Sequence, residues 1–380
     1  MTWRAPVPGA LALGTLISLW SLPFVRFAPN RLLTGDGLAW WRAPLGLGHW
    51  AALLPCGLLL LAWRAQSRAT RVVGLPAAAL WLVALPWLAG MAARQMAPEV
   101  DGLARVSLGA GFWLSWGLMA LLLGELLREA AWPVWRRVLL WVGVLLALLA
   151  ELSGGALDHL SLLREYANHQ DAFNLAFGQH VQLVALSVAP AALLGASLGL
   201  LAARRSRVQG ALFAVLNLIQ TLPSIALFGL LVAPLAWLGE HVPGLGIAGI
   251  GMAPGILALT LYSLLPMTRG TLAGLQQVPA AAVDAARGMG MGSWQILWQV
   301  ELPLALPVFL TGLRITAVQA VGLAEVAALI GAGGFGAIMF QGLLGSAIDL
   351  VLLGVIPVVA LAIAVDLLFK LIIAGVARHD

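Results

Sequence analysis

Long runs of apolar residues dominate this sequence and limit what it can fold into. About ten of them are long enough to cross a bilayer, which takes roughly 20 apolar residues in a helix. Of the 380 residues, 61% are hydrophobic and 10% are charged, a balance that soluble domains do not have. We therefore predict an all-α, polytopic inner-membrane protein. The predicted spans are residues 8–25, 46–63, 72–91, 107–127, 134–152, 178–202, 209–232, 245–268, 304–330 and 350–374.

The basic residues indicate how these spans are oriented. With a cytoplasmic N-terminus, the inner segments carry 14 of the 21 basic residues and the outer loops carry six, while Arg314 lies within a span. Short cytoplasmic loops of membrane proteins carry an excess of Lys and Arg. The distribution therefore predicts a multi-pass protein with both termini in the cytoplasm, and it places residues 278–303 on the cytoplasmic side.

A change in composition near residue 153 divides the chain. Thirteen of the 16 Trp residues precede it, many of them near predicted span ends, such as Trp40 and Trp41. This placement is typical of interfacial anchors, with a cage for a quaternary ammonium as the alternative. We predict an N-terminal region of about five spans over residues 1–153, an external polar linker over 154–177 and a five-span core over 178–380.

A moderately polar segment, residues 278–303, interrupts the apolar runs of the core. Its Ala-rich residues 280–286 are predicted to form a short helix that ends by Gly290. Ser293 suits the N-cap of a second short helix over residues 294–300. Two short helices with small side chains, lying outside the bilayer, favour a docking surface for another protein.

This segment resembles the "EAA" loop of ABC-importer permeases. The family signature is Glu-Ala-Ala, three residues, Gly, nine residues, then Ile-x-Leu-Pro. Here Asp284-Ala285-Ala286, Gly290 and Val300-Glu301-Leu302-Pro303 keep the spacing, with Asp for Glu and Val for Ile. In that family the loop is the coupling helix that sits in a cleft of the cytoplasmic ATPase. The alternative is an ordinary amphipathic loop. Pro303 is predicted to end the second helix or to kink it into the next span. The residues implied in ATPase coupling are Asp284, Ala285, Ala286, Gly290, Leu302 and Pro303.

Two further segments of the core contain residues that disturb helices. Residues 217–231, NLIQTLPSIALFGLL, place Pro223 in mid-span between Thr221 and Ser224, whose hydroxyls can help to satisfy the carbonyl that a proline frees. A packing kink and a role in a transport path explain this pattern equally well. Residues 328–345, ALIGAGGFGAIMFQGLLG, are rich in glycine, which is tolerated at membrane depth only where backbone packs tightly or lines a cavity.

Both segments resemble permeases of the glycine betaine, choline and carnitine branch of ABC importers. The resemblance implies that they belong to the translocation path, with the glycine-rich segment near its outer mouth. The residues predicted for this path, including two carboxylates, are Thr221, Pro223, Ser224, Glu325, Gly333, Gly334, Gly336 and Asp349.

Ionisable residues within a bilayer are costly and are functional candidates by default. Arg314 and Glu325 both lie in the predicted ninth span, about 16 Å apart along a helix and too far for a direct pair. We predict a structural role for Arg314. Glu325 either has a function, in binding a cationic head group or a proton, or it has none. In the second case its side chain extends to the membrane interface or is protonated. Asp349 either attracts a cation at the outer gate or caps the next helix, and Asp366 is predicted to pair with Lys370.

The chain has no ATPase motif of its own. A Walker A motif requires Gly-Lys-Ser/Thr, and the single lysine, Lys370, lies in Phe-Lys-Leu. The single cysteine, Cys56, allows no intramolecular disulfide. We therefore expect a transport subunit that is not an enzyme, with no catalytic residue, no metal, no nucleic acid partner and no cofactor in this chain, the ATP being bound by a partner ATPase.

The resemblance to the osmoprotectant branch extends to the long, Yeh-type subgroup and implies a MetI-like, type I importer core. It implies the permease subunit of a binding-protein-dependent importer for osmoprotectants such as glycine betaine or related quaternary amines. The implied partners are cytoplasmic ABC ATPase subunits, a periplasmic substrate-binding protein, membrane lipid and a second permease subunit, either this chain or a shorter paralogue. The alternative is an ion-coupled secondary transporter, which predicts several intramembrane carboxylates and an internal repeat.

Overall fold

The computed structural model describes residues 6–30, 35–64, 68–96 and 104–376. The chain forms two compact units, Met1–Asn168 (unit 1) and His169–Asp380 (unit 2). Their division falls inside the predicted linker of residues 154–177. Much of that linker is helical, because it contains α6 (Ser161–Asn168) and the first turns of α7 (Gln170–Arg204).

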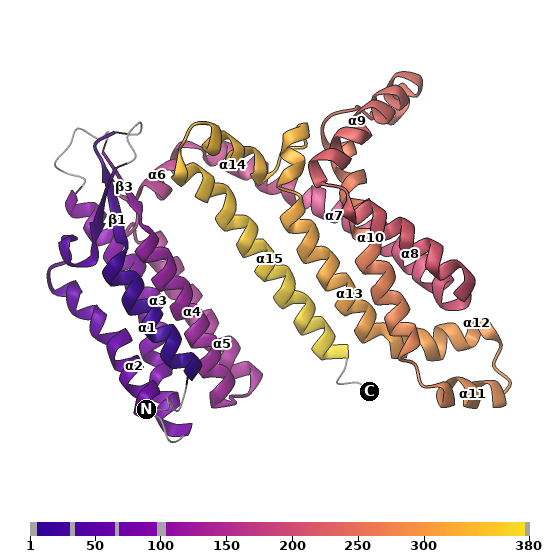
Figure 1. The fold of residues 1–380 in the computed structure, drawn as a ribbon, viewed down its shortest axis with the longest axis horizontal. Helices are drawn as coiled ribbons and strands as arrows, with labels where there is room; N and C mark the ends of the chain where they lie inside the picture. The colour runs from indigo at the N-terminus through magenta and orange to yellow at the C-terminus, as the bar shows by residue number, and fades with distance from the viewer. Residues whose placement is uncertain (1–5, 31–34, 65–67, 97–103, 377–380) are drawn as a thin grey trace. The chain divides into compact units, whose positions relative to one another are not determined.

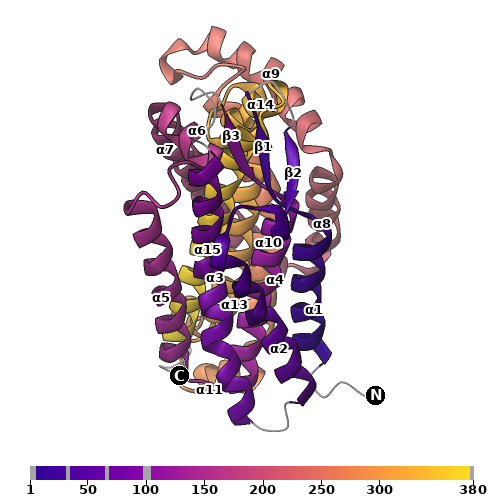
Figure 2. The same cartoon turned by 90° about the vertical axis from the view of Figure 1, so that its left-hand side faces the viewer.

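Unit 1 is a helical bundle with a small antiparallel sheet at the end where α1 finishes (Figures 1 and 2). The sheet has the order β2-β1-β3, and β1 pairs with both neighbours. The elements before α6 are α1 (Pro6–Ser21), β1 (Pro23–Ala28), β2 (Asp36–Ala39), η1 (Trp40–Arg42), η2 (Gly46–Ala52), α2 (Leu53–Arg64), α3 (Arg68–Met96), β3 (Arg105–Leu108), α4 (Ala110–Ala130) and α5 (Val134–Ser153).

The sheet was not among our predictions, which assigned helices alone. Its strands contain only four to six residues, and a hydropathy window of spanning length averages them with the helices beside them. Gly109 explains how the sheet meets the bundle, because a Cβ at this position would clash with the carbonyl oxygen of Pro23 in β1. The absence of a side chain at Gly109 therefore lets α4 begin directly against the sheet.

Aromatic side chains fill the centre of unit 1. Trp81 is fully buried, and its Nε1 donates a hydrogen bond to Ser115 Oγ (3.2 Å). Trp40 is buried too and packs edge-on against Phe24, with 4.8 Å between the ring centroids. The prediction of an interfacial anchor was wrong for Trp40, because the chain folds back at η1 and carries this residue into the core. Trp41 beside it is exposed.

Unit 2 is a helical bundle with α11 and α12 at one end and α14 at the other (Figures 1 and 2). Besides α7, its elements are α8 (Ser206–Thr221), α9 (Ser224–His241), η4 (Pro243–Leu245), α10 (Met252–Gln276), α11 (Ala280–Gly288), α12 (Ser293–Ile296), the π-helical turn η5 (Leu297–Glu301), α13 (Leu302–Leu323), η6 (Val326–Ile330), α14 (Phe335–Leu344) and α15 (Ile348–Val376).

Small residues hold the centre of unit 2 together. A Cβ added to Gly199 of α7 would lie 2.5 Å from Thr271 Cβ of α10, and one added to Gly270 of α10 would lie 2.8 Å from Gly312 Cα of α13. Small residues at such crossings let helices in a membrane approach closely, so that van der Waals packing can replace the missing hydrophobic driving force.

The structure confirms a polytopic helical protein, with seven helices in the described residues that are long and apolar enough to cross a membrane. Shorter apolar helices occur beside these seven at Val7–Ser21, Gly46–Leu61 and Phe335–Leu344, and the first two overlap predicted spans. The predicted span over residues 209–232 was wrong. The chain leaves the helix at Leu222, whose extended backbone (φ −67°, ψ 133°) is the conformation that a following proline imposes.

The close approach of α7 to α10 can be tested with a pair of matched substitutions. We expect Gly199→Ala to destabilise unit 2 by about 1–3 kcal/mol, because the added methyl group must displace Thr271 or the carbonyl of Thr268. Gly210→Ala in α8 is the control, because a Cβ at Gly210 meets no atom within 4 Å. Thermal unfolding of the purified protein in detergent measures both, and equal melting temperatures would show that the crossing tolerates a methyl group.

Candidate functional site

The first candidate site is the loop between α10 and α13, which begins with α11. This helix ends in a Schellman motif: Gly290 N–H donates to the Arg287 carbonyl (2.9 Å) and Met291 N–H donates to the Ala286 carbonyl (3.1 Å). Gly290 has a φ of +84°, which side chains disfavour, so the motif explains why a glycine is needed four residues after Ala286. The chain is thereby turned towards α12.

The second half of this loop differs from our prediction of a separate helix over residues 294–300. Gly292, and not Ser293, is the N-cap residue of α12, and its N–H donates to Gln295 Oε1 (2.9 Å). Pro303 does not end this helix, which continues through the π turn η5 into α13. The wider π turn accommodates the proline ring, which would clash with a carbonyl one turn earlier in a regular α-helix.

The loop presents an exposed apolar face that we did not predict from the sequence. Trp294 and Trp298 are 69% and 55% exposed, and their rings meet edge-on with 5.6 Å between centroids. Met289 is exposed beside them in sequence, as are Asp284 and Ala285. Exposed aromatic side chains are typical anchors of protein interfaces. The sequence does contain a signal for this face, because two Trp residues at i and i+4 lie on the same side of a helix.

The other residues predicted for this loop lie in different surroundings. Ala286 is only 1% exposed and packs inside the protein, so it supports the loop and does not belong to its outer face. Leu302 is half-buried and Pro303 is exposed, both in the first turn of α13. The structure therefore places Asp284, Ala285, Gly290 and Pro303 at the surface of the loop.

An ion pair ties this loop to α7. Arg204, in the last turn of α7, donates from Nη1 to Glu301 Oε1 (3.1 Å) and from Nη2 to Glu301 Oε2. Glu301 lies in the π turn, and its side chain is only 10% exposed. Such a two-point guanidinium–carboxylate contact fixes orientation as well as distance. In the family signature this position is variable, so the motif alone assigns no role to Glu301.

The second candidate site is the break between α8 and α9. Tyr262 of α10 donates from Oη to the carbonyl oxygen of Leu222 (2.6 Å), and Gln220 donates from Nε2 to the carbonyl oxygen of Tyr262 (2.8 Å). Thr221 Oγ1 donates to the Leu218 carbonyl (2.8 Å), and Ser224 begins α9. The interrupted backbone is thus held against α10 by side chains.

The glycine-rich segment after α13 forms a tight, polar turn against α7. Gly331, Gly333 and Gly334 all have φ between +76° and +79°. Gln179 of α7 accepts a hydrogen bond from Gly334 N–H at its Oε1 (3.0 Å), and a side chain on Gly333 would collide with Gln179. The buried His180 contacts the Val321 carbonyl through Nε2 (3.1 Å). No sequence pattern linked Gln179 or His180 to this turn, because they lie more than 140 residues away from it.

Two carboxylates predicted for the transport path occupy other positions in the secondary structure than expected. Glu325 lies just beyond the α-helical part of the predicted ninth span, because α13 ends at Leu323 and Glu325 precedes the 3-10 turn η6; Gly336 of α14 packs against its carbonyl oxygen. Hydropathy cannot distinguish an α-helix from a 3-10 turn, so the span was drawn too long. Asp349 is not an N-cap residue either. It lies in the first turn of α15, where a carboxylate still opposes the positive end of the helix dipole.

The predicted pair of Asp366 and Lys370 is confirmed, with 2.7 Å between Lys370 Nζ and Asp366 Oδ2. Arg314 Nε lies 3.4 Å from Asp366 Oδ1, which joins α13 to α15. In the described part of the chain, His, Cys, Asp and Glu side chains do not gather in groups of three that could hold a metal.

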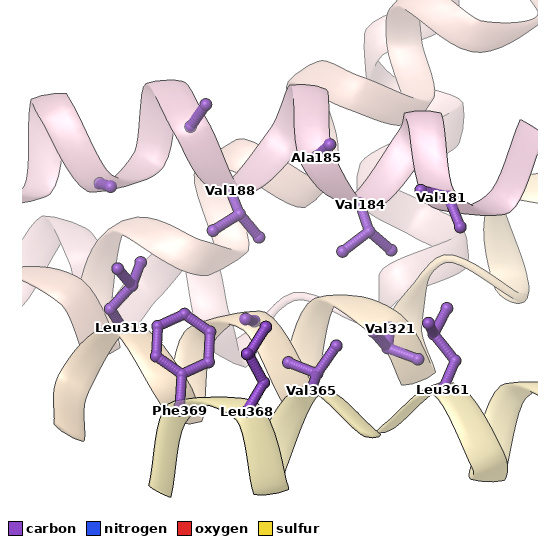
Figure 3. A pocket seen from close by; sticks show the side chains of 13 residues that line it. Val181, Val184, Ala185, Val188, Leu313, Val321, Leu361, Val365, Leu368 and Phe369 are labelled. Atoms are coloured by element: carbon purple, nitrogen blue, oxygen red, sulfur yellow. The ribbon is translucent and has the colours of Figure 1, made fainter. Parts of the chain in front are cut away.

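Two hollows occur in the bundle of unit 2, and they differ in chemistry. The first, about 360 Å³, lies between α7, α13 and α15, and Figure 3 shows only hydrocarbon side chains around it, such as Val184, Leu313 and Phe369. The second, about 390 Å³, lies between α8, α10 and α13 and is called the polar cavity below. Its polar side chains are Gln220, Arg269, Thr311 and Gln319. Of these two hollows, the polar cavity is the one that can form hydrogen bonds with a solute.

Family comparisons cover both units. Residues 195–378 match the family described as "Binding-protein-dependent transport system inner membrane component". Residues 4–163 match "ABC transporter permease YehY, N-terminal domain". The division between the two units falls between the two matches.

Several characterised proteins are similar to part of this chain. The osmoprotectant import permease protein OsmW of Salmonella typhimurium is 40% identical over 188 residues, which are 50% of this chain and 84% of that protein. The carnitine transport permease protein OpuCD of Listeria monocytogenes is 34% identical over 216 residues, 56% of this chain and 90% of that protein. The choline transport system permease protein OpuBD of Bacillus subtilis is 36% identical over 210 residues, 54% of this chain and 86% of that protein.

Among solved structures, an inward-facing form of the MetNI methionine ABC transporter has a similar fold. The TM-score is 0.50 at 22% sequence identity, over 55% of this chain and 98% of that chain. This likeness confirms the MetI-like fold that the sequence predicted for the core.

The ion pair between Arg204 and Glu301 predicts an effect on stability. We expect Glu301→Gln to lower the free energy of unfolding by roughly 1–3 kcal/mol, because the Arg204 guanidinium loses a charged partner at a largely buried position. The exchange of both charges, Arg204→Glu with Glu301→Arg, should recover part of the loss. The control is Arg287→Gln, whose ion pair with Asp284 is exposed on both sides and worth at most about 1 kcal/mol. Thermal unfolding distinguishes these cases, and equal losses at the two pairs would show that burial of Glu301 adds nothing.

Proposed function

The chain belongs to the family of inner membrane components of binding-protein-dependent ABC transport systems, and from this premise we propose that it is the permease subunit of an importer for osmoprotectants such as glycine betaine or related quaternary amines. It forms the translocation path and couples that path to a separate ATPase. The comparisons lend no support to an ion-coupled secondary transporter.

The proposed substrate class rests on one observation. The relatives described above are named as permeases for osmoprotectant, carnitine or choline transport, at 34–40% identity over most of their own lengths. The shared chemistry of carnitine and choline is a quaternary ammonium group on a small solute. This agrees with the resemblance of residues 217–231 and 328–345 to the same branch.

The loop containing α11 and α12 is the proposed contact with the ATPase. Asp284, Ala285, Gly290 and Pro303 lie at its surface together with the exposed Trp294 and Trp298, while Ala286 and Leu302 hold it to the rest of unit 2. ATP binding closes the ATPase subunits, and the loop transmits this motion to the spans, which alternate between inward- and outward-facing states. This arrangement requires the loop and both termini to be cytoplasmic, as the distribution of basic residues indicates.

The proposed transport path includes two of the places where the backbone of unit 2 departs from regular α-helix. One is the α8–α9 break with Thr221, Pro223 and Ser224, and the other is the turn from Glu325 to Gly336, followed by Asp349. Non-helical backbone at membrane depth is tolerated where it is buried in protein or lines a cavity. A periplasmic binding protein delivers the solute, and a second permease subunit, either this chain or a paralogue, completes the path.

Reconstitution tests this function. The chain would be placed in proteoliposomes with its ATPase, its binding protein and any second permease, and uptake of labelled glycine betaine, choline and carnitine would be measured with and without internal ATP. We expect uptake only with ATP. Uptake that is independent of ATP and driven by a proton or sodium gradient would overturn the proposal.

Gly290 gives a sharper test of the coupling loop. We expect Gly290→Val to reduce ATP-dependent uptake severalfold, because a side chain at φ +84° costs at least about 1–2 kcal/mol and opens the Schellman motif. Gly288→Val is the matched control, since Gly288 lies two residues earlier, ends α11 without a positive φ, and has no atom within 4 Å of an added Cβ. Equal uptake by the two variants would show that the turn at Gly290 is not required.

A further inference from the structure

The polar cavity between α8, α10 and α13 has properties that packing alone does not explain. Its lining comes from α8, α10 and α13, and it adjoins the α8–α9 break through Gln220, the second-last residue of α8. Polar side chains of membrane-spanning helices normally face a protein interior or a water-filled space. The cavity is open on one side, where Arg269 and Ile315 are exposed, and it offers a few polar groups on a wall that is mostly apolar.

The hydrogen-bonding groups of the cavity are only partly used within the protein. Gln220 donates to the Tyr262 carbonyl and Thr311 donates to the Pro307 carbonyl (2.9 Å). Arg269 donates from Nη2 to Asn217 Oδ1 (2.9 Å), which leaves other guanidinium N–H groups for a further partner. Gln319 makes no side-chain hydrogen bond to any other residue that the structure describes. Its amide can be satisfied by water or by a solute in the cavity.

The positive charge of the cavity favours small solutes that carry a carboxylate. Arg269 is the only charged residue among the eleven that line it, all of which are described, so the site carries a positive charge with no carboxylate to balance it. A guanidinium binds a carboxylate through two parallel hydrogen bonds, and it repels a solute that is only cationic. The remaining wall, including Leu265, Val308 and Ile315, is apolar and can contact methyl groups.

We propose that the polar cavity is a solute subsite of the transport path that holds a zwitterion by its carboxylate. Arg269 binds the carboxylate, Gln319 donates or accepts a further hydrogen bond, and the methyl groups of the ammonium end lie against the apolar wall. This inference rests on the proposed function and adds a selectivity to it. The permease itself distinguishes betaines, which carry a carboxylate, from choline, which carries a hydroxyl in its place.

Equilibrium binding to the purified permease–ATPase complex, without the binding protein, tests this subsite. Labelled glycine betaine and labelled choline form the probe pair, since both carry a trimethylammonium group and only the first has a carboxylate. The wild-type complex should bind glycine betaine about tenfold or more tightly than choline, because one charge-assisted contact accounts for such a ratio. Arg269→Gln should remove most of this difference, while Arg269→Lys should keep part of it.

Two further variants separate the subsite from general effects. Gln319→Leu should weaken the binding of both solutes, because it replaces a hydrogen-bonding group by an apolar one of similar size. Arg207→Gln is the control for loss of a positive charge, since Arg207 is an exposed residue at the start of α8 and does not line the cavity. It should leave both affinities unchanged.

The proposal is overturned if the wild-type complex binds neither solute, if it binds choline as tightly as glycine betaine, or if Arg269→Gln and Arg207→Gln have the same effect. None of these results would contradict the proposed function, which is judged separately by ATP-dependent uptake into proteoliposomes. Conversely, a complex that binds glycine betaine through Arg269 but takes up no solute with ATP would contradict the proposed function and leave the subsite intact.

Discussion

The attachment of α7 at both of its ends organises unit 2. At one end, Arg204 holds Glu301 in the π turn that leads from α12 into α13. At the other end, Gln179 and His180 hold Gly334 and the end of α13. Between these contacts, Gly195 and Gly199 let α7 lie directly on α10. A single helix of 35 residues thus contacts the exposed loop at one end of the unit and the glycine-rich turn at the opposite end.

Departures from helical geometry in unit 2 are compensated by specific side chains. Tyr262 satisfies the Leu222 carbonyl at the α8–α9 break, and Gln179 satisfies the Gly334 N–H in the glycine-rich turn. An unpaired backbone group in a bilayer costs several kcal/mol, so a break can persist only where such a partner exists. Each break is therefore tied to a residue distant in sequence, and the candidate transport segments depend on the packing of α7 and α10.

Much of the fold class and of the coupling loop could be predicted from the sequence, because both depend on local patterns. Spanning length and hydropathy identify α3, α7, α10 and α15, and the spacing from Asp284 to Pro303 identifies the loop. The Asp366–Lys370 pair follows from helical periodicity. The three-stranded sheet and the end of α13 before Glu325 were missed, since a hydropathy window averages over about 20 residues and registers neither short strands nor a change of helix type. The disturbance expected at Pro223 is a complete break in the helix at Leu222.

The sequence alone determined that this chain is a polytopic membrane protein with a loop that matches the spacing of the ABC-importer signature, because composition, span length and motif spacing are properties of consecutive residues. Only the tertiary structure decided which side chains meet. Arg204 and Glu301 are 97 residues apart, and Gln179 and Gly334 are 155 apart. The polar cavity likewise combines Gln220, Arg269 and Gln319 from three helices. Contacts of this kind depend on how the helices cross, and the close crossings at Gly199, Gly270 and Gly312 exist only in the packed bundle.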